Sequence, residues 1–129
     1  MRRLHLAPLA LVAALLSTGC LAAAAAGAAG GVYLTTRGAE SVIAASVDDV
    51  AARAESVMGE MGIAKDGEST EDQGDKRVLK GKQGDLDVTI DITRESPTTS
   101  KVEVTARKNL AEWDKDYAKE VLSRIVEKG

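Results

Sequence analysis

The chain has 129 residues and a formal net charge of −3, and it contains no phenylalanine, one tryptophan and two tyrosines. This length allows one small domain, and its core must be built from Val, Ile, Leu, Met and Ala. The weakly acidic balance, without a basic stripe or paired aromatic residues, excludes nucleic acid as an expected partner.

The first nineteen residues have the features of a secretory signal peptide. Arg2 and Arg3 form a charged start, residues 9–16 are an uninterrupted apolar run, and small residues precede Cys20. This arrangement resembles the bacterial lipobox, in which the cysteine accepts a diacylglycerol group before cleavage. We therefore expect residues 1–19 to be removed and Cys20 to become the lipid-carrying first residue, with residues 20–37 as an Ala/Gly-rich tether.

The same segment allows an alternative, a single-pass protein with an uncleaved membrane-spanning helix. Residues 6–36 carry no charged side chain, and ~20 apolar residues are enough to span a bilayer. The second half of this segment is alanine and glycine, which contribute little to insertion, so the lipid anchor is favoured. A lipid-anchored chain faces the periplasm of the bacterial cell envelope. The residue after Cys20 is Leu21 and not an aspartate, which favours sorting to the outer membrane.

The first elements of the domain follow the tether. The gain in Thr, Val and Ile between Tyr33 and Ala45 predicts one short strand. Ser46 then stands in a helix-capping position with Asp49 three residues later, and apolar residues recur at helical spacing up to Gly62. These signals predict a helix over residues 46–61.

Short strands separated by turns are predicted from residue 63 to residue 107. The turn signals are "EDQGDK", "QGD" and "ESPTTS". Apolar residues alternate with polar residues over 86–93 and again over 101–107, and a period of two with one polar face predicts a sheet that is covered on one side.

The last predicted element is an amphipathic helix. Asn109 is its expected cap with Glu112 three residues later, and its apolar face is formed by Leu110, Trp113, Tyr117, Val121, Leu122, Ile125 and Val126. We expect residues 38–129 to form a two-layer α+β domain, in which one antiparallel sheet of four or five strands packs against two helices. The expected order is strand, helix, three or four strands, helix.

The order of motifs resembles a family of small bacterial lipoproteins known only as a domain of unknown function. The chain has "GC" before the tether, then "YLTTRG", "GDLDV", "TSKVEV" and "VLSRIVEK" near its end. The resemblance implies a lipid anchor and a small envelope domain, and it lends no catalytic residue.

The residues needed for common catalytic and metal sites are scarce. The only histidine is His5, in the predicted leader, and the only cysteine is Cys20. The mature chain is therefore expected to have no nucleophilic triad, no zinc site, no catalytic residue and no cofactor. A calcium loop begun at Asp66 would need Gly and Glu where the chain has Glu71 and Arg77, so this acidic segment is interpreted as a solvated turn.

The outward side chains of the two alternating strands form the predicted binding face, which consists of Asp87, Asp91, Lys101, Glu103 and Arg107. We expect the aspartates to stand opposite Lys101 or Arg107 across a hairpin. A non-enzymatic envelope module would use this face, or an unpaired sheet edge that accepts a strand, to bind another envelope component, a second copy of itself or the wall. The alternatives are a face that meets only water and an acidic module that binds a small ligand or a metal.

Overall fold

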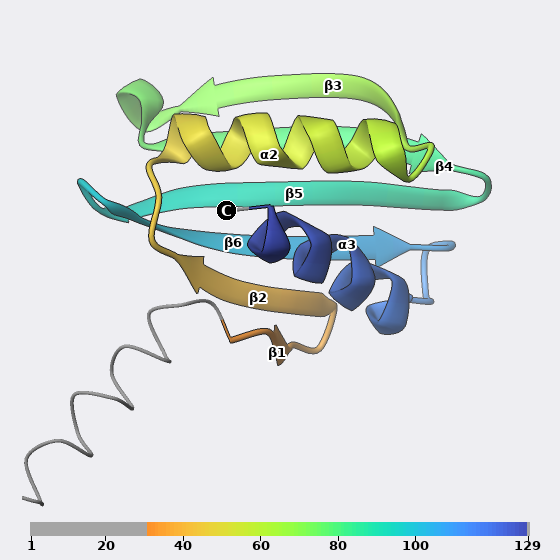
Figure 1. The fold of residues 1–129 in the computed structure, drawn as a ribbon. Helices are drawn as coiled ribbons and strands as arrows, with labels where there is room; N and C mark the ends of the chain where they lie inside the picture. Colours follow the sequence, from red (N-terminus) through yellow and green to blue (C-terminus); the bar gives the residue numbers. More distant parts are fainter. Residues whose placement is uncertain (1–30, 129) are drawn as a thin grey trace, which may run out of the picture.

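The computed structural model describes residues 31–128, so the predicted signal peptide, Cys20 and most of the predicted tether lie outside the described residues. The elements are β1 (Tyr33–Leu34), β2 (Gly38–Ile43), α2 (Val47–Glu60), β3 (Ala64–Glu71), a 3-10 turn (Asp72–Gly74), β4 (Lys76–Gln83), β5 (Leu86–Ser96), β6 (Thr99–Arg107) and α3 (Lys115–Glu127). They form one antiparallel six-stranded sheet in the order β1-β2-β6-β5-β4-β3, with both helices on one face (Figure 1). The predicted α+β class is confirmed.

The sheet has more strands than the four or five that were predicted. The segment expected to form one strand forms two, because the chain turns between Leu34 and Gly38. The Thr35 hydroxyl holds this turn by accepting a hydrogen bond from the Gly38 backbone N–H at 3.0 Å. Tyr33 and Leu34 then pair with β2, so β1 lies within the range 20–37 that was assigned to the tether.

Helix α2 begins and ends where the sequence indicates. The Ser46 side chain accepts a hydrogen bond from the Asp49 N–H at 3.2 Å, and Gly62 follows the helix with a φ of +70°, a conformation that favours glycine. Val50, Ala54 and Val57 are fully buried. The helix runs along the strand direction and packs mainly on β4 and β5 (Figure 1).

Helix α3 begins later than predicted. The Asn109 side-chain oxygen accepts hydrogen bonds from the backbone N–H groups of residues 111 and 112. The N-cap is nevertheless Asp114, and the helix starts at Lys115. The Arg107 guanidinium accounts for the delay, because it donates to the carbonyl oxygens of Asn109 and Leu110 at 3.0 and 2.9 Å and holds them in a loop. Leu110, expected on the buried helix face, is 88% exposed.

One hydrophobic core fills the space between the helices and the sheet. Val121 and Ile125 of α3 are fully buried, as are Ile90, Val102 and Val104 of β5 and β6. Helix α3 packs on β2 and β6, beside α2. The alternation of buried and more exposed side chains along β5 and β6 bears out the prediction of a sheet covered on one side.

Candidate functional site

The candidate site is the open face, defined as the face of the sheet opposite α2 and α3. Strand alternation places Asp87, Asp91, Lys101, Glu103 and Arg107 on this face, because each is the immediate sequence neighbour of a buried residue and successive side chains of a strand point to opposite faces. The structure does not bring these five residues into one cluster. They divide between two shallow hollows that lie at different positions along the strands.

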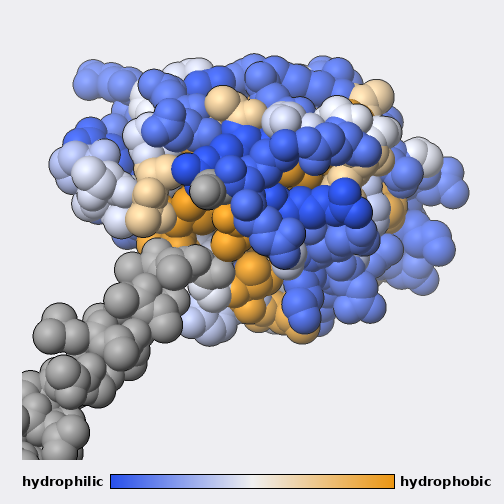
Figure 2. Space-filling model, in the orientation of Figure 1, coloured by the Kyte–Doolittle hydropathy of each residue, from blue (hydrophilic) through white to orange (hydrophobic). Residues whose placement is uncertain are grey.

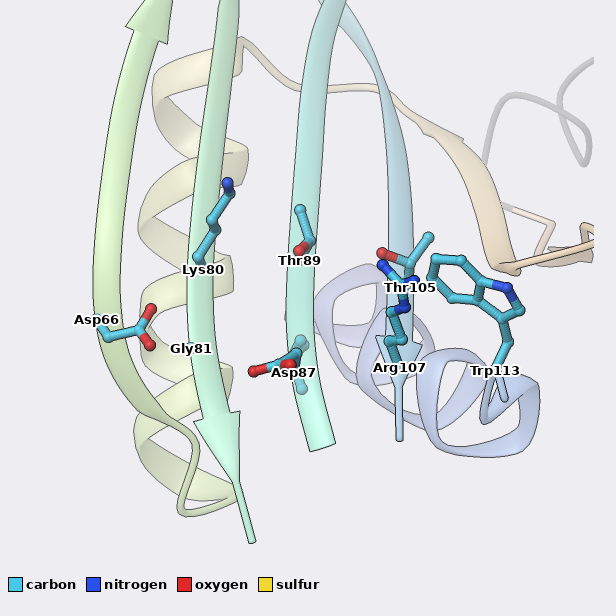
Figure 3. A pocket seen from close by; sticks show the side chains of 9 residues that line it. Asp66, Lys80, Gly81, Asp87, Thr89, Thr105, Arg107 and Trp113 are labelled. Atoms are coloured by element: carbon cyan, nitrogen blue, oxygen red, sulfur yellow. The ribbon is translucent and has the colours of Figure 1, made fainter. Parts of the chain in front are cut away.

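The first hollow, of about 290 Å³, runs across four strands. Its main side chains come from β3 (Asp66), β4 (Lys80), β5 (Asp87 and Thr89), β6 (Thr105 and Arg107) and the loop before α3 (Trp113) (Figure 3). Carboxylates, cations and hydroxyl groups therefore line the same depression. Such a lining suits a ligand surface that carries both signs of charge.

Arg107 is held in place at the edge of the first hollow. Its Nε and one terminal nitrogen donate to backbone carbonyls, and its guanidinium carbon lies 5.2 Å from the centre of the Trp113 ring. Asp87 stands opposite Arg107 in the β5–β6 register, as expected. The ion pair that Asp87 makes is nevertheless with Lys82 of β4, at 3.5 Å.

The second hollow, of about 340 Å³, is lined by Lys76, Asp91, Thr93, Glu95, Lys101 and Glu103. Asp91 stands opposite Glu103, and Glu103 stands opposite Glu40 on β2. The expectation that Asp91 faces a cation across the hairpin was therefore wrong. Lys101 offsets part of this charge through a 3.6 Å ion pair with Glu40, and Lys76 is the second cation in the lining of this hollow.

Several residues of the hollows were missed at the sequence level. The outward positions of Thr89 and Thr105 follow from the alternation that placed Asp87 and Arg107. Lys80 could have been found in the same way on β4 had that strand's register been known. Trp113 had no such signal, because helical spacing assigned it to a buried helix face, whereas it lies in the loop before α3.

The densest ionic cluster lies on the other face, along the outer edge of the sheet. Glu68 of β3 binds Lys65 and Arg77, and these cations also reach Glu55 and Asp48 of α2 at 2.5 and 3.1 Å. The hydrogen bond from Lys65 and, to a smaller extent, the hydrogen bond from Arg77 lower the pKa of Glu68 to about 2. The contacts run from β3 to α2, so this cluster connects the polar edge strand to the helix.

Two further properties of the described residues concern metal ligands and membrane-spanning helices. Within residues 31–128, no group of three or more His, Cys, Asp or Glu side chains is placed to hold a metal ion. No helix in that range combines the length and the apolar content needed to cross a membrane. The open face can engage a ligand through hydrogen bonds and ion pairs made at two separate hollows.

No family model matches the chain, and neither the curated proteins nor the solved structures include a match to it. The resemblance to a lipoprotein family therefore stays a prediction from the sequence.

Proposed function

We propose that this chain is a lipid-anchored, non-enzymatic module of the bacterial cell envelope that binds another envelope protein through the open face. The observation that carries the proposal is a six-stranded sheet with helices on one side only, whose other side has two charged hollows. Two of their carboxylates, Asp91 and Glu103, stand directly opposite each other. A bound protein surface that supplies cations there relieves this repulsion.

The anchor in this proposal is the lipid on Cys20, and outer-membrane attachment is the favoured location. The support is the run of small residues before Cys20 and the Ala/Gly-rich segment after it. In the described part of the chain, the domain begins with a two-residue edge strand, β1, close to the predicted tether. A tethered domain of this kind can present its open face to a neighbour in the envelope.

The substitution Cys20→Ser tests the anchor. We expect the variant to keep its leader or to appear in the soluble fraction, because serine cannot form the thioether to diacylglycerol. Cell fractionation and intact-mass measurement distinguish the processed, acylated wild type from the variant. A variant that stays in the membrane with an uncleaved leader, beside a wild type of the same unprocessed mass, would instead support the spanning helix.

The open face is tested by site-specific photo-crosslinking in cells. A photoreactive residue at Thr89, in the first hollow, or at Thr93, in the second, should give discrete crosslinked bands. The same residue at Lys119, on the exposed surface of α3, is the control and should not. A crosslinked band at twice the mass of the chain would identify a second copy of the protein as the partner.

Charge reversal tests the same face without a photoreactive group. The double variant Asp87→Lys, Asp91→Lys should fold normally, because exposed ion pairs contribute only ~0 to 1 kcal/mol, and it should lose the crosslinked partner. Asp116→Lys with Glu127→Lys makes the same change in net charge on α3 and should keep the partner. Crosslinks that survive the reversal on the open face would exclude that face as the docking surface.

A further inference from the structure

Three of the four large hydrophobic side chains that are exposed among the described residues lie near one end of the domain. They are Tyr33 and Leu34 of β1, exposed by 63% and 56%, and Leu110, exposed by 88%. Leu34 lines the same surface depression as Trp113. Tyr33 points to the other face of the sheet, because it is the strand neighbour of Leu34, so we call Leu34, Leu110 and Trp113 the apolar patch.

Trp113 holds the two loops of the apolar patch together. The guanidinium carbons of Arg37, from the β1–β2 turn, and of Arg107, from β6, lie 5.6 and 5.2 Å from the centre of its ring. Arg107 also donates to the Leu110 carbonyl at 2.9 Å, which fixes the loop that exposes Leu110. The patch is therefore an ordered surface of leucine, aromatic and arginine side chains from two separate segments.

The patch lies close to the point where the described chain begins. β1 starts two residues after Gly31, and Gly31 lies eleven positions after Cys20, a length that reaches at most about 36 to 40 Å. Figure 2 shows hydrophobic surface that extends from the middle of the molecule, over the region of β2, down to its lower edge near β1. A lipid on Cys20 therefore keeps this end of the domain within reach of the bilayer.

We infer that the apolar patch rests on the phospholipid surface that holds the anchor, so that the domain has one preferred orientation at the membrane. Tryptophan favours the headgroup region, and arginine can place its apolar stem against lipid while its charge meets phosphate. Lys108 and Lys115 stand beside the patch together with Glu112, Asp114 and Asp116. This mixture of charges suits a headgroup layer that contains both phosphate and ammonium groups. The inference rests on the proposed lipid anchor.

The single tryptophan makes this orientation measurable. The full acylated chain, reconstituted into phosphatidylethanolamine–phosphatidylglycerol vesicles, should lose roughly half of its Trp113 emission when the lipids carry bromine near the headgroup, because an interfacial contact places the ring only ~5 to 10 Å deep. Leu34→Asp with Leu110→Asp should abolish most of this quenching while the lipid keeps the chain on the vesicles. Val42→Asp is the control, because Val42 is 40% exposed on the open face and should leave quenching unchanged.

The results of this experiment distinguish a failure of the proposed orientation from a failure of the proposed lipid anchor. Wild-type protein that floats with the vesicles but shows the same emission in brominated and ordinary lipid overturns the inference and leaves the anchor standing. Equal quenching in the double aspartate variant also overturns it, because Trp113 would then meet lipid without the two leucines. Protein that does not float with the vesicles at all overturns the anchor and, with it, the orientation.

Discussion

Replacing Ile125 with alanine should lower the free energy of unfolding by about 2 to 5 kcal/mol. The side chain is fully buried between α3 and the sheet, so the variant loses the burial of its methyl and methylene groups and leaves a cavity. This loss is a large share of the stability of a domain of this size. Urea unfolding followed by Trp113 fluorescence measures it, and Val121→Ala should act in the same direction.

The matched control is Leu110→Ala, which removes a leucine side chain that is 88% exposed. Its effect on unfolding in solution should be within about 0.5 kcal/mol, as for most surface substitutions. Equal losses for Ile125→Ala and Leu110→Ala would contradict both the late start of α3 and its packing on β2 and β6.

Gly38→Ala should destabilise the domain by about 3 kcal/mol, at the upper end of the range for overpacking. A Cβ atom at this position would lie 2.0 Å from the Val104 carbonyl oxygen, which belongs to the backbone of β6 and cannot rotate away. The strand β2 would have to move off β6 at this end. Thermal and urea unfolding report the loss, and hydrogen exchange at the β2 amides locates it.

Gly59→Ala is the matched control for Gly38→Ala. Gly59 lies inside α2, and a Cβ atom there would meet nothing within 4 Å. The substitution should raise the free energy of unfolding by about 0.5 to 1 kcal/mol, because alanine loses less backbone entropy in a helix than glycine. If both glycine variants unfold like the wild type, β2 does not approach β6 as closely as described.

The elements with strong local signals could be predicted from the sequence. The cap at Ser46 and the alternation along β5 and β6 depend on neighbouring residues, and both are confirmed. β1 could not be predicted, because two residues carry no periodicity and their pairing with β2 depends on the turn at Thr35. The start of α3 was misplaced because Asn109 closes a local turn that has the same spacing as a cap.

The candidate site was predictable only in part for a related reason. The alternation of apolar and polar residues shows which side chains of a strand point away from the core, so Asp87 and Arg107 could be placed on the same face. It does not tell which strands are neighbours or how they are aligned. The juxtaposition of Asp91, Glu103 and Glu40 depends on β2 pairing with β6, and the role of Trp113 depends on a loop that brings it beside two arginines.

The strand order also sets the sequence in which the domain can assemble. β3, β4, β5 and β6 follow one another along the chain and pair as consecutive hairpins, which close quickly. β2 pairs with β6, and the paired residues are 57 (Ile43 and Ser100) to 67 (Gly38 and Thr105) positions apart, so closing this contact costs the corresponding chain entropy. When the chain emerges from its N-terminus, β2 therefore appears before β3 to β6, but its pairing with β6 forms last. β1 covers only two residues of β2, on the side away from β6, so during that interval the β6-facing edge of β2 is open to wrong partners.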